Sequence, residues 1–383
     1  MLGRRNFLEL AAIAGLAAPA LARSGAIAAT DAGADAAAMA LALKDGRTSA
    51  AELVAAAAAR LAAVNGKLNA THILYPGRAA EEAKTHFKGS PLAGIPTFIK
   101  DLAPERGVVA SEGSRAFARR VADADSPSVM AVRAAGLIPL GRTTAPEFGL
   151  LPTTEPLLTG PTRNPWNPGH SVGGSSGGAA ALVAAGVVPV AHASDGGGSI
   201  RIPASMTGLV GLKPSRGRMA GEEGASGVLA FGVNGCLSRS VRDTAAWFAA
   251  CESRGGVLPP VGLVTGPARR ALRIGVRAAG ALGTEPDADV AAVFVATQQM
   301  LARLGHRTVE APLPFDGPAV VAAFELLWGG GAAKDIARAG QFLGRPPTAE
   351  DIEPATFGFA SLARGHAPAD FEAAAARLAE MAA

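Results

Sequence analysis

The chain has 383 residues, of which 49% are hydrophobic and 18% are charged. This composition excludes intrinsic disorder, which requires low hydrophobicity and high charge, and the length is sufficient for a large hydrophobic core. The net charge of +4 arises from 36 basic and 32 acidic residues spread along the chain. Because nucleic-acid binding requires a concentrated stripe of Lys and Arg, we expect no nucleic-acid partner.

The N-terminal segment, residues 1–30, predicts an export signal. Arg4-Arg5 precede an apolar run from Leu10 to Leu21, and the small-x-small triplet Ala20-Leu21-Ala22 has the form of a cleavage site. This order is typical of a twin-arginine signal that directs a protein to the periplasm. The run is shorter than the ~20 residues of a membrane-spanning helix, so we expect no stable membrane anchor. An ordinary basic amphipathic N-terminus is the alternative.

The remainder of the chain shows no linker, charge block or internal repeat, which predicts a single domain over residues 31–383. Its two cysteines, Cys236 and Cys251, are too few for a disulfide framework, and we expect two buried thiols. Neither cysteine has a histidine at metal-ligand spacing, so we expect no metal site and no cofactor.

Helical and strand-like segments alternate along the chain. Ser49 and Glu52 have the form of a capping box and Asn65-Gly66 is a stop signal, which predicts a helix over 50–64. The apolar segment Leu92 to Ile99, ending on Lys100-Asp101, predicts a buried strand. Helix and strand pairs are then predicted at 128–135 and 137–141, 177–185 and 187–193, 241–251 and 272–276, and 286–304 and 307–311, with a last helix over 369–382. This alternation predicts an α/β fold with an internal sheet covered by helices.

Two glycine-rich clusters that contain serine flank the predicted helix 177–185 and strand 187–193. They are Gly173-Gly174-Ser175-Ser176-Gly177-Gly178 and Asp195-Gly196-Gly197-Gly198-Ser199-Ile200-Arg201. Glycine lets the backbone approach a ligand closely and direct several N–H groups to one point, which suits an oxyanion. Amide hydrolysis needs such donors and a nucleophile. Ser199 offers the hydroxyl, and the N–H groups of residues 196–199 offer the oxyanion hole. A structural or anion-binding glycine turn is the alternative.

A serine nucleophile needs a base, and the residues near the clusters leave this choice open. His192 lies within the predicted strand 187–193, where a core histidine is expected. Lysine is scarce, with seven against twenty-nine arginines, and Lys100 follows the apolar segment 95–99. Burial favours the neutral amine, which can act as a base. A lysine whose ammonium reaches the surface is the alternative.

Together these motifs resemble the amidase signature. The resemblance depends on the two serine clusters, on the 24-residue separation of Ser175 and Ser199, and on Gly208-Leu-Val-Gly-Leu-Lys-Pro214. It is supported by Lys100-Asp101, Gly113-Ser114, Gly141 to Gly149 and Asn164-Pro165. It spans roughly residues 40 to 310 and is long enough to be specific. It implies a mixed internal β-sheet covered by helices in one amidase domain.

The resemblance also implies a role for each matching residue. Ser199 is expected to be the nucleophile, Ser175 a proton relay that follows a cis peptide bond after Gly174, and Lys100 the general base. Water then cleaves the acyl-enzyme. Oxyanion and substrate-binding roles are expected for Gly196, Gly197, Gly198 and Ser176. We expect Asp195 and Arg201 to shape the nucleophile loop, with Asp195 accepting backbone N–H groups or pairing with Arg201.

The segments 160–166 and 191–205 are most similar to the family branch of the 6-aminohexanoate cyclic-dimer hydrolases. We therefore expect the partner to be a small-molecule substrate, a linear or cyclic aliphatic amide. The sequence leaves open whether the protein forms a homodimer. Family members usually continue with a further C-terminal segment. We therefore expect this chain to be C-terminally truncated and to expose apolar surface.

Two other functions fit parts of the sequence. Gly173-x-Ser175-x-Gly177 has the form of the nucleophile elbow of an α/β-hydrolase esterase, with His306 or His366 as base. That interpretation requires a strand leading directly into Ser175, whereas residues 165–171 are rich in Pro, Gly and Asn. The second alternative is a non-catalytic exported binding protein on a degenerate amidase scaffold, whose glycine clusters hold an anion.

Overall fold

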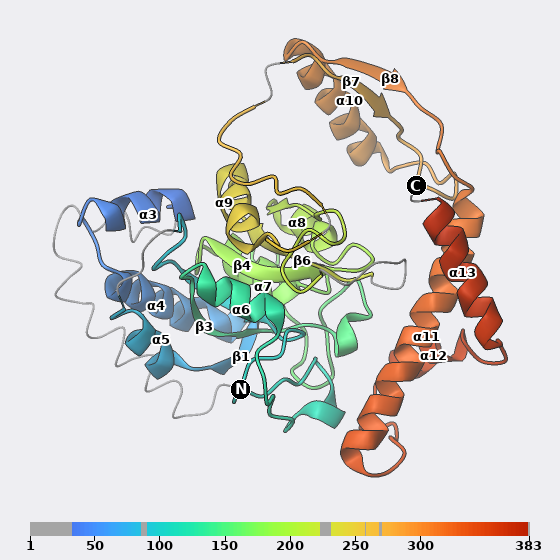
Figure 1. Ribbon diagram of the computed structural model, residues 1–383, viewed down its shortest axis with the longest axis horizontal. Coiled ribbons are helices and arrows are strands. Elements are labelled where there is room, and N and C mark those ends of the chain that lie inside the picture. Colours follow the sequence, from blue (N-terminus) through green and yellow to red (C-terminus); the bar gives the residue numbers. More distant parts are fainter. Residues whose placement is uncertain (1–32, 86–89, 223–230, 257, 268–269, 382–383) are drawn as a thin grey trace. The chain divides into compact units, whose positions relative to one another are not determined.

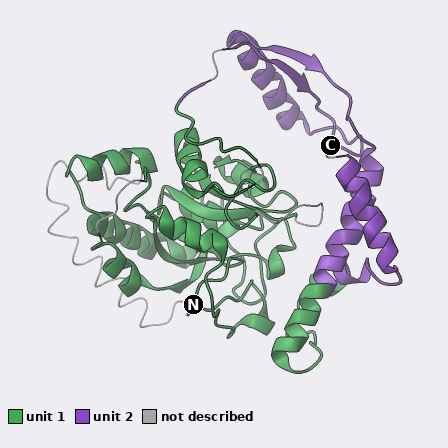
Figure 2. Cartoon of the chain, viewed as in Figure 1, with its two compact units in different colours: residues 1–226, 230–265, 334–357 green, residues 227–229, 266–333, 358–383 purple. Residues whose placement is uncertain are grey.

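The computed structural model describes residues 33–85, 90–222, 231–256, 258–267 and 270–381 of the chain. They fall into two compact units (Figure 2). Unit 1 contains the described residues up to 265 together with residues 334–357, and unit 2 contains the described residues of 266–333 and 358–383. The predicted export signal lies outside the described residues. The single amidase domain over 31–383 stays a prediction.

Unit 1 is built around two three-stranded sheets, ordered β1-β3-β2 and β4-β6-β5 (Figure 1). In the first, β3 (Ile138–Thr143) has β1 (Thr71–Leu74) antiparallel and β2 (Pro96–Lys100) parallel to it. In the second, β4 (Val190–Asp195) and β5 (Val210–Gly211) are antiparallel to β6 (Val233–Ser238). The sheets meet where the Thr97 hydroxyl donates to the Val190 carbonyl at 3.0 Å. The expected α/β fold with a mixed internal sheet is confirmed.

Helices cover both faces of these strands, because successive strand residues point to opposite sides. Phe98 of β2 belongs to the core formed with α4 (Ala50–Leu68) and α7 (Gly177–Ala184). Ile99 belongs to the opposite core, formed with α3 (Ala36–Lys44), α6 (Pro127–Ala134) and α9 (Val241–Cys251). The free thiols Cys236 and Cys251 are buried in this second core. The alternation places Lys100, two residues after Phe98, on the face that α7 covers.

The helix predicted over 50–64 begins as expected but continues to Leu68. The capping box is present, since Ser49 Oγ accepts the Glu52 N–H at 3.2 Å and Glu52 Oε2 accepts the Ser49 N–H at 2.8 Å. Asn65 does not end the helix, because its side chain bonds the backbone of residues 70 and 71 beyond it. The left-handed C-cap is Asn69, at φ 51°. The predicted C-terminal end of this helix was therefore wrong.

The other predicted segments lie close to observed elements. The strand predicted at 187–193 is β4 and begins three residues later, at Val190. Later elements are β7 (Arg273–Val276), α10 (Ala288–Arg303), β8 (Arg307–Glu310) and α13 (Pro368–Glu380). Elements whose bounds were not predicted are the strands β1, β5 and β6, the helices α3, α5 (Pro76–Glu82), α8 (Arg201–Thr207), α11 (Gly317–Leu343) and α12 (Pro354–Ser361), and the short 3₁₀ turns Arg115–Phe117 and Glu147–Gly149.

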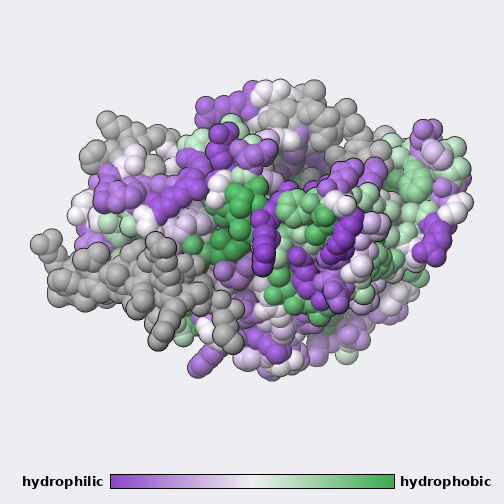
Figure 3. Space-filling model, turned by 90° about the horizontal axis from the view of Figure 1, so that it is seen from below, coloured by the Kyte–Doolittle hydropathy of each residue, from purple (hydrophilic) through white to green (hydrophobic). Residues whose placement is uncertain are grey.

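Unit 2 contains the parallel pair β7 and β8, joined by α10, and most of the C-terminal helices. Those helices are α11 (Gly317–Leu343), α12 (Pro354–Ser361) and α13, with the end of α11 and the start of α12 assigned to unit 1. Helix α10 buries none of its residues, and Val293 on it is 67% exposed. Hydrophobic and hydrophilic areas both occur on the molecular face in Figure 3. Within the described ranges, no helix is both long and apolar enough to span a membrane.

Candidate active site

Lys100 is the last residue of β2, where it pairs with Thr143 of β3, and its side chain is fully buried. Its Nζ lies 2.8 Å from Ser175 Oγ, 3.1 Å from Ser194 Oγ and 3.2 Å from the Ser194 carbonyl oxygen. Burial lowers the pKa of Lys100 to about 7, although the negative charge of Asp195 opposes this shift. The neutral amine is therefore well populated at neutral pH.

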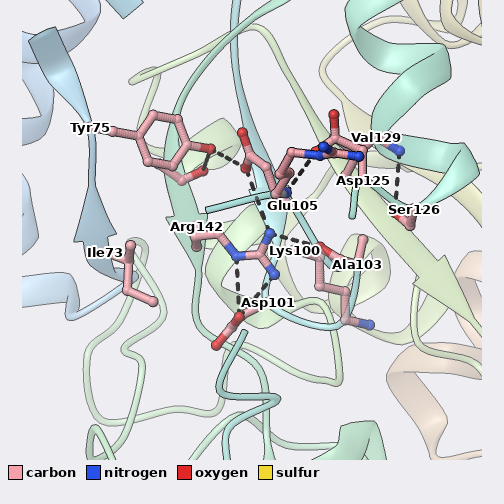
Figure 4. A network of polar contacts seen from close by, with 12 residues as sticks. Ile73, Tyr75, Lys100, Asp101, Ala103, Glu105, Asp125, Ser126, Val129 and Arg142 are labelled. Atoms are coloured by element: carbon pink, nitrogen blue, oxygen red, sulfur yellow. Dashed lines mark hydrogen bonds and ion pairs between the residues drawn. The ribbon is translucent and has the colours of Figure 1, made fainter. Parts of the chain in front are cut away.

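A buried network of charged groups fixes the chain that follows Lys100 (Figure 4). Asp101 Oδ1 accepts from Arg142 Nε at 3.2 Å and from Nη2 at 2.9 Å, and both side chains are completely buried. Glu105, also buried, accepts the Tyr75 hydroxyl at 2.7 Å and lies 3.7 Å from the Arg142 guanidinium. Each carboxylate has a cationic partner, so the end of β2 is held without an unpaired buried charge.

Ser175 lies in the loop before α7, and the cis peptide bond that the resemblance implied is present between Gly174 and Ser175. Position 174 requires glycine, because a Cβ there would lie 2.4 Å from the Thr153 carbonyl oxygen. The Ser175 side chain is almost fully buried. A Cβ at Gly149 would lie 3.3 Å from Ser175 Oγ, so the turn at residues 147–149 closes over this hydroxyl.

Ser199 lies between β4 and α8, two residues before the helix begins. The Ser176 N–H donates to the Ser199 carbonyl oxygen at 3.3 Å, which joins the two serine loops. Ser199 is 8% exposed, and its hydroxyl has no hydrogen-bond partner in the part of the chain that the structure describes. The structure thus brings Lys100 and Ser175 into contact and places the Ser199 hydroxyl in the adjoining loop, bonded to neither.

The four N–H groups expected as oxyanion donors are not equivalent. Gly198 N–H donates to Asp195 Oδ1 at 2.7 Å, so its hydrogen bond is already made within the loop. Gly198 has φ 130°, and a Cβ there would lie 2.6 Å from the Ile202 side chain. The N–H groups of Gly196, Gly197 and Ser199 have no acceptor among the described residues. Three of the four donors are thus available to a developing oxyanion.

Asp195 organises the loop that carries Ser199. Its buried carboxylate accepts the N–H groups of Gly198 at 2.7 Å and Ile200 at 3.2 Å, and it also pairs with Arg201. Arg201 Nε lies 2.9 Å from Oδ2 and Nη2 lies 3.0 Å from Oδ1, a two-bond fork. Burial would raise the pKa of Asp195, but the hydrogen bonds and the charge of Arg201 outweigh it, so this pKa is lowered. Asp195 is therefore an anion that fixes the backbone between β4 and α8.

Ser176 and Ser194 connect the first serine loop with β4. The Ser176 hydroxyl donates to the Ser194 carbonyl oxygen at 3.2 Å, and Ser176 is 0% exposed. Ser194 was not predicted as a site residue, although it directly precedes Asp195. A neutral amine has two N–H groups and one lone pair. The Ser194 carbonyl and hydroxyl can accept the two N–H groups of Lys100, which leaves the lone pair directed at Ser175.

We expect Ser194→Ala to lower kcat about three- to tenfold, since it removes one hydrogen bond worth about 1 kcal/mol to the amine and keeps the carbonyl acceptor. Ser194→Thr retains the hydroxyl and should restore the rate. Steady-state kinetics of both variants between pH 7 and pH 9 measure the effect. A Ser194→Ala enzyme with the wild-type kcat would show that the hydroxyl does not orient Lys100.

The three histidines considered as bases contact groups other than the site serines. His192 is buried in β4, where its Nδ1 accepts the Lys100 backbone N–H at 3.3 Å. Burial, and then the charge of Lys100, lower the pKa of His192 to about 3, so the ring is neutral. His306 Nδ1 accepts the Leu272 N–H at 3.2 Å, and His366 Nδ1 lies 3.3 Å from Asp370. No strand leads into Ser175, since residues 160–176 contain a single isolated bridge. The nucleophile elbow therefore has no support in the local structure.

Comparisons with known sequences give a consistent result. The profile of the Amidase family matches residues 52–356. AmiC of Mycobacterium tuberculosis, a protein named as an amidase, is 41% identical over 332 residues, which cover 85% of this chain and 70% of AmiC. The 6-aminohexanoate-cyclic-dimer hydrolase of Paenarthrobacter ureafaciens is 36% identical over 338 residues, which cover 83% of this chain and 68% of the hydrolase.

Solved structures agree with the sequences. The complex of 6-aminohexanoate cyclic dimer hydrolase with its substrate matches with a TM-score of 0.83 and 34% identity, over 92% of this chain and 76% of that chain. A bacterial aryl acylamidase of the amidase signature family matches with a TM-score of 0.81 and 25% identity, over 89% and 74% of the two chains. The family profile spans the site loops, and these relatives cover most of the chain. The chain therefore belongs to the amidase signature family of amide-hydrolysing enzymes.

Proposed function

We propose that the protein hydrolyses small linear or cyclic aliphatic amides through a serine acyl-enzyme, with a proton relay of Lys100, Ser175 and Ser199. The observation that carries this proposal is the buried 2.8 Å contact between Lys100 Nζ and Ser175 Oγ. Because burial also brings the pKa of Lys100 to about 7, the amine can accept a proton under physiological conditions. The unbonded Ser199 hydroxyl in the adjoining loop supplies the nucleophile.

Each step of the reaction has a group in this site. The neutral Lys100 amine accepts the Ser175 proton while Ser175 takes the proton of Ser199, whose Oγ attacks the amide carbon. The oxyanion accepts the N–H groups of Gly196, Gly197 and Ser199, each typically worth about 3 kcal/mol of barrier. The proton returns through Ser175 to the departing amine. Water, deprotonated along the same path, then cleaves the acyl-enzyme and releases the carboxylic acid.

The substrate class is proposed from the relatives. The similarity to the 6-aminohexanoate-cyclic-dimer hydrolase, at 36% identity, supports an aliphatic amide. Similarity at this level limits the class of bond more firmly than the shape of the substrate, because substrate pockets change faster than catalytic groups. The linear 6-aminohexanoate dimer, the cyclic dimer and hexanamide are therefore the first compounds to compare.

A serine-directed probe tests the proposal together with this amide panel. Purified protein is incubated with a fluorophosphonate and, separately, with each amide, and the labelled peptide and the released ammonia or amine are measured. We expect labelling at Ser199 and release from at least one amide. Labelling at Ser175 would favour the elbow esterase instead. A protein that neither labels nor releases product would favour the non-catalytic binding scaffold.

We further propose that the chain is exported through the twin-arginine route. The support is the order of Arg4-Arg5, the apolar run to Leu21 and the triplet Ala20-Leu21-Ala22. The variant Arg4→Lys/Arg5→Lys keeps the charge but removes the arginine pair, so we expect it to stay in the cytoplasm at full length. Cell fractionation with N-terminal sequencing of the periplasmic form measures this. Equal periplasmic amounts of wild type and variant would exclude the route.

A further inference from the structure

The carboxylate of Asp195 is a buried negative charge close to the proposed base. It follows Ser194, whose carbonyl and hydroxyl both contact Lys100 Nζ. A nearby anion favours the ammonium over the neutral amine, and Asp195 does raise the pKa of Lys100 against the effect of burial. If this carboxylate had no cationic partner, it would favour a protonated Lys100 that cannot act as a base.

Arg201 is placed to neutralise this charge. Its guanidinium makes the two-bond fork to Asp195, at 2.9 and 3.0 Å, and Asp195 in turn holds the pKa of Arg201 above its ordinary value. The Asp195 side chain is 0% exposed, whereas that of Arg201 is 53% exposed. The pair therefore joins a buried anion, which acts on the base, to a cation at the protein surface.

The other charged groups around Lys100 and Asp195 are already accounted for. His192 from β4 is neutral, as its lowered pKa requires. Asp101, the next residue after Lys100, is paired with Arg142 of β3. Burial lowers the pKa of Lys213, which follows β5, and the negative charge of Asp195 opposes this shift. Among the described residues, however, the cation within 4.0 Å of the Asp195 carboxylate is Arg201. Arg201 is thus the group whose loss would leave Asp195 without a direct counter-charge.

We propose that Arg201 is a positioning residue that keeps Lys100 uncharged at neutral pH by neutralising Asp195. This rests on the proposed function, in which Lys100 is the general base. Arg201 takes no part in bond making or proton transfer and acts through Asp195 alone. It follows that its removal changes the pH at which the enzyme works, in addition to any effect on the shape of the loop.

The variant Arg201→Gln removes the charge and keeps a hydrogen-bonding side chain. We expect the acid limb of its pH profile, which lies near pH 7 in the wild type, to move upward by about one pH unit. The reaction should then be about fivefold slower at pH 7, approach about tenfold slower at lower pH, and differ much less at pH 9. Two readouts on the full chain measure this. They are kcat/KM for the released amine of the best substrate, and the rate of fluorophosphonate labelling of Ser199. Arg201→Lys retains the charge and should show a smaller shift.

Two further variants separate charge from shape. Asp195→Asn removes the anion and should move the acid limb to lower pH, opposite to Arg201→Gln. The double variant Asp195→Asn/Arg201→Gln removes both charges, so its limb should not lie above that of the wild type. Arg242→Gln is the matched control, because Arg242 is 64% exposed and makes a similar fork to Asp35 at 2.6 and 2.7 Å outside this site. Its profile should be unchanged.

The proposal is overturned if Arg201→Gln loses activity at every pH while its acid limb stays at the wild-type position, since Arg201 then only shapes the loop. It is also overturned if the double variant keeps the upward shift, since Asp195 then does not transmit the effect. Failure of the proposed function looks different. Amide hydrolysis would survive Ser199→Ala, or the wild type would show no acid limb near pH 7 in either readout. Thermal unfolding of each variant confirms that it is folded.

Discussion

Ser199→Ala is expected to abolish amide hydrolysis, with a loss of roughly four orders of magnitude or more in kcat. The expectation follows from the hydroxyl, which has no hydrogen-bond partner among the described residues, and from its loop, in which the N–H groups of Gly196, Gly197 and Ser199 have no acceptor there. Because the substitution breaks no hydrogen bond, the free energy of unfolding should change by no more than about 0.5 kcal/mol. Product release and thermal unfolding measured on the same preparation test both parts.

Ser128→Ala is the matched control for this variant. Ser128 lies in α6 and has the same 8% exposed fraction as Ser199. It makes one weak contact, at 3.2 Å, with the Ser126 hydroxyl, and it is not part of the serine loops. The control should keep wild-type kinetics and fluorophosphonate labelling. Residual turnover of Ser199→Ala above a hundredth of the wild-type rate would mean that another group attacks the substrate.

Lys100→Ala is expected to lose about 10²- to 10⁴-fold in kcat at pH 7, the usual contribution of a general base. The sign of the pH dependence follows from the pKa of about 7 that burial gives Lys100. The neutral amine is the active form, so the wild-type rate falls as the pH drops below 7 and levels off above it. The variant has no such titration. Its deficit should therefore become smaller at high pH, where hydroxide or another base can substitute.

Lys100→Met controls for the space that the alanine leaves. Lys100 is fully buried, and its truncation opens a cavity in the core beside Ser175, which by itself lowers stability. Methionine fills most of that space without a basic nitrogen, so it should lose as much activity as alanine while unfolding at a higher temperature. Either variant retaining the wild-type rate at pH 7 would refute Lys100 as the base and leave the 2.8 Å contact with Ser175 without a catalytic meaning.

The sequence by itself determined the elements whose signals are local. The capping box of Ser49 and Glu52 starts α4 because both partners lie within one helical turn. The long apolar segment before Lys100 marks a buried strand, since both faces of β2 are covered by helices. The two serine clusters are equally local, because glycine is needed wherever the backbone approaches another segment as closely as Gly174 approaches Thr153.

Only the tertiary structure decided the features that depend on distant partners. The end of α4 moved from residue 64 to Leu68, because the Asn65 side chain bonds backbone groups of the strand that follows. The strands β1, β5 and β6 had no prediction. β1 and β5 have only four and two residues, and β6 is defined by its antiparallel pairing with β4 and β5.

The same reason explains what the sequence left open at the site. Ser194 contacts Lys100 only because β4 lies beside β2. The Gly198 N–H donates to Asp195 only because of the way their loop folds. Residue types and spacing therefore determined which chemical groups this protein has available. The strand order and loop geometry decided which of them meet, because hydrogen bonds and charge pairs act over a few ångströms in space, whatever the separation along the chain.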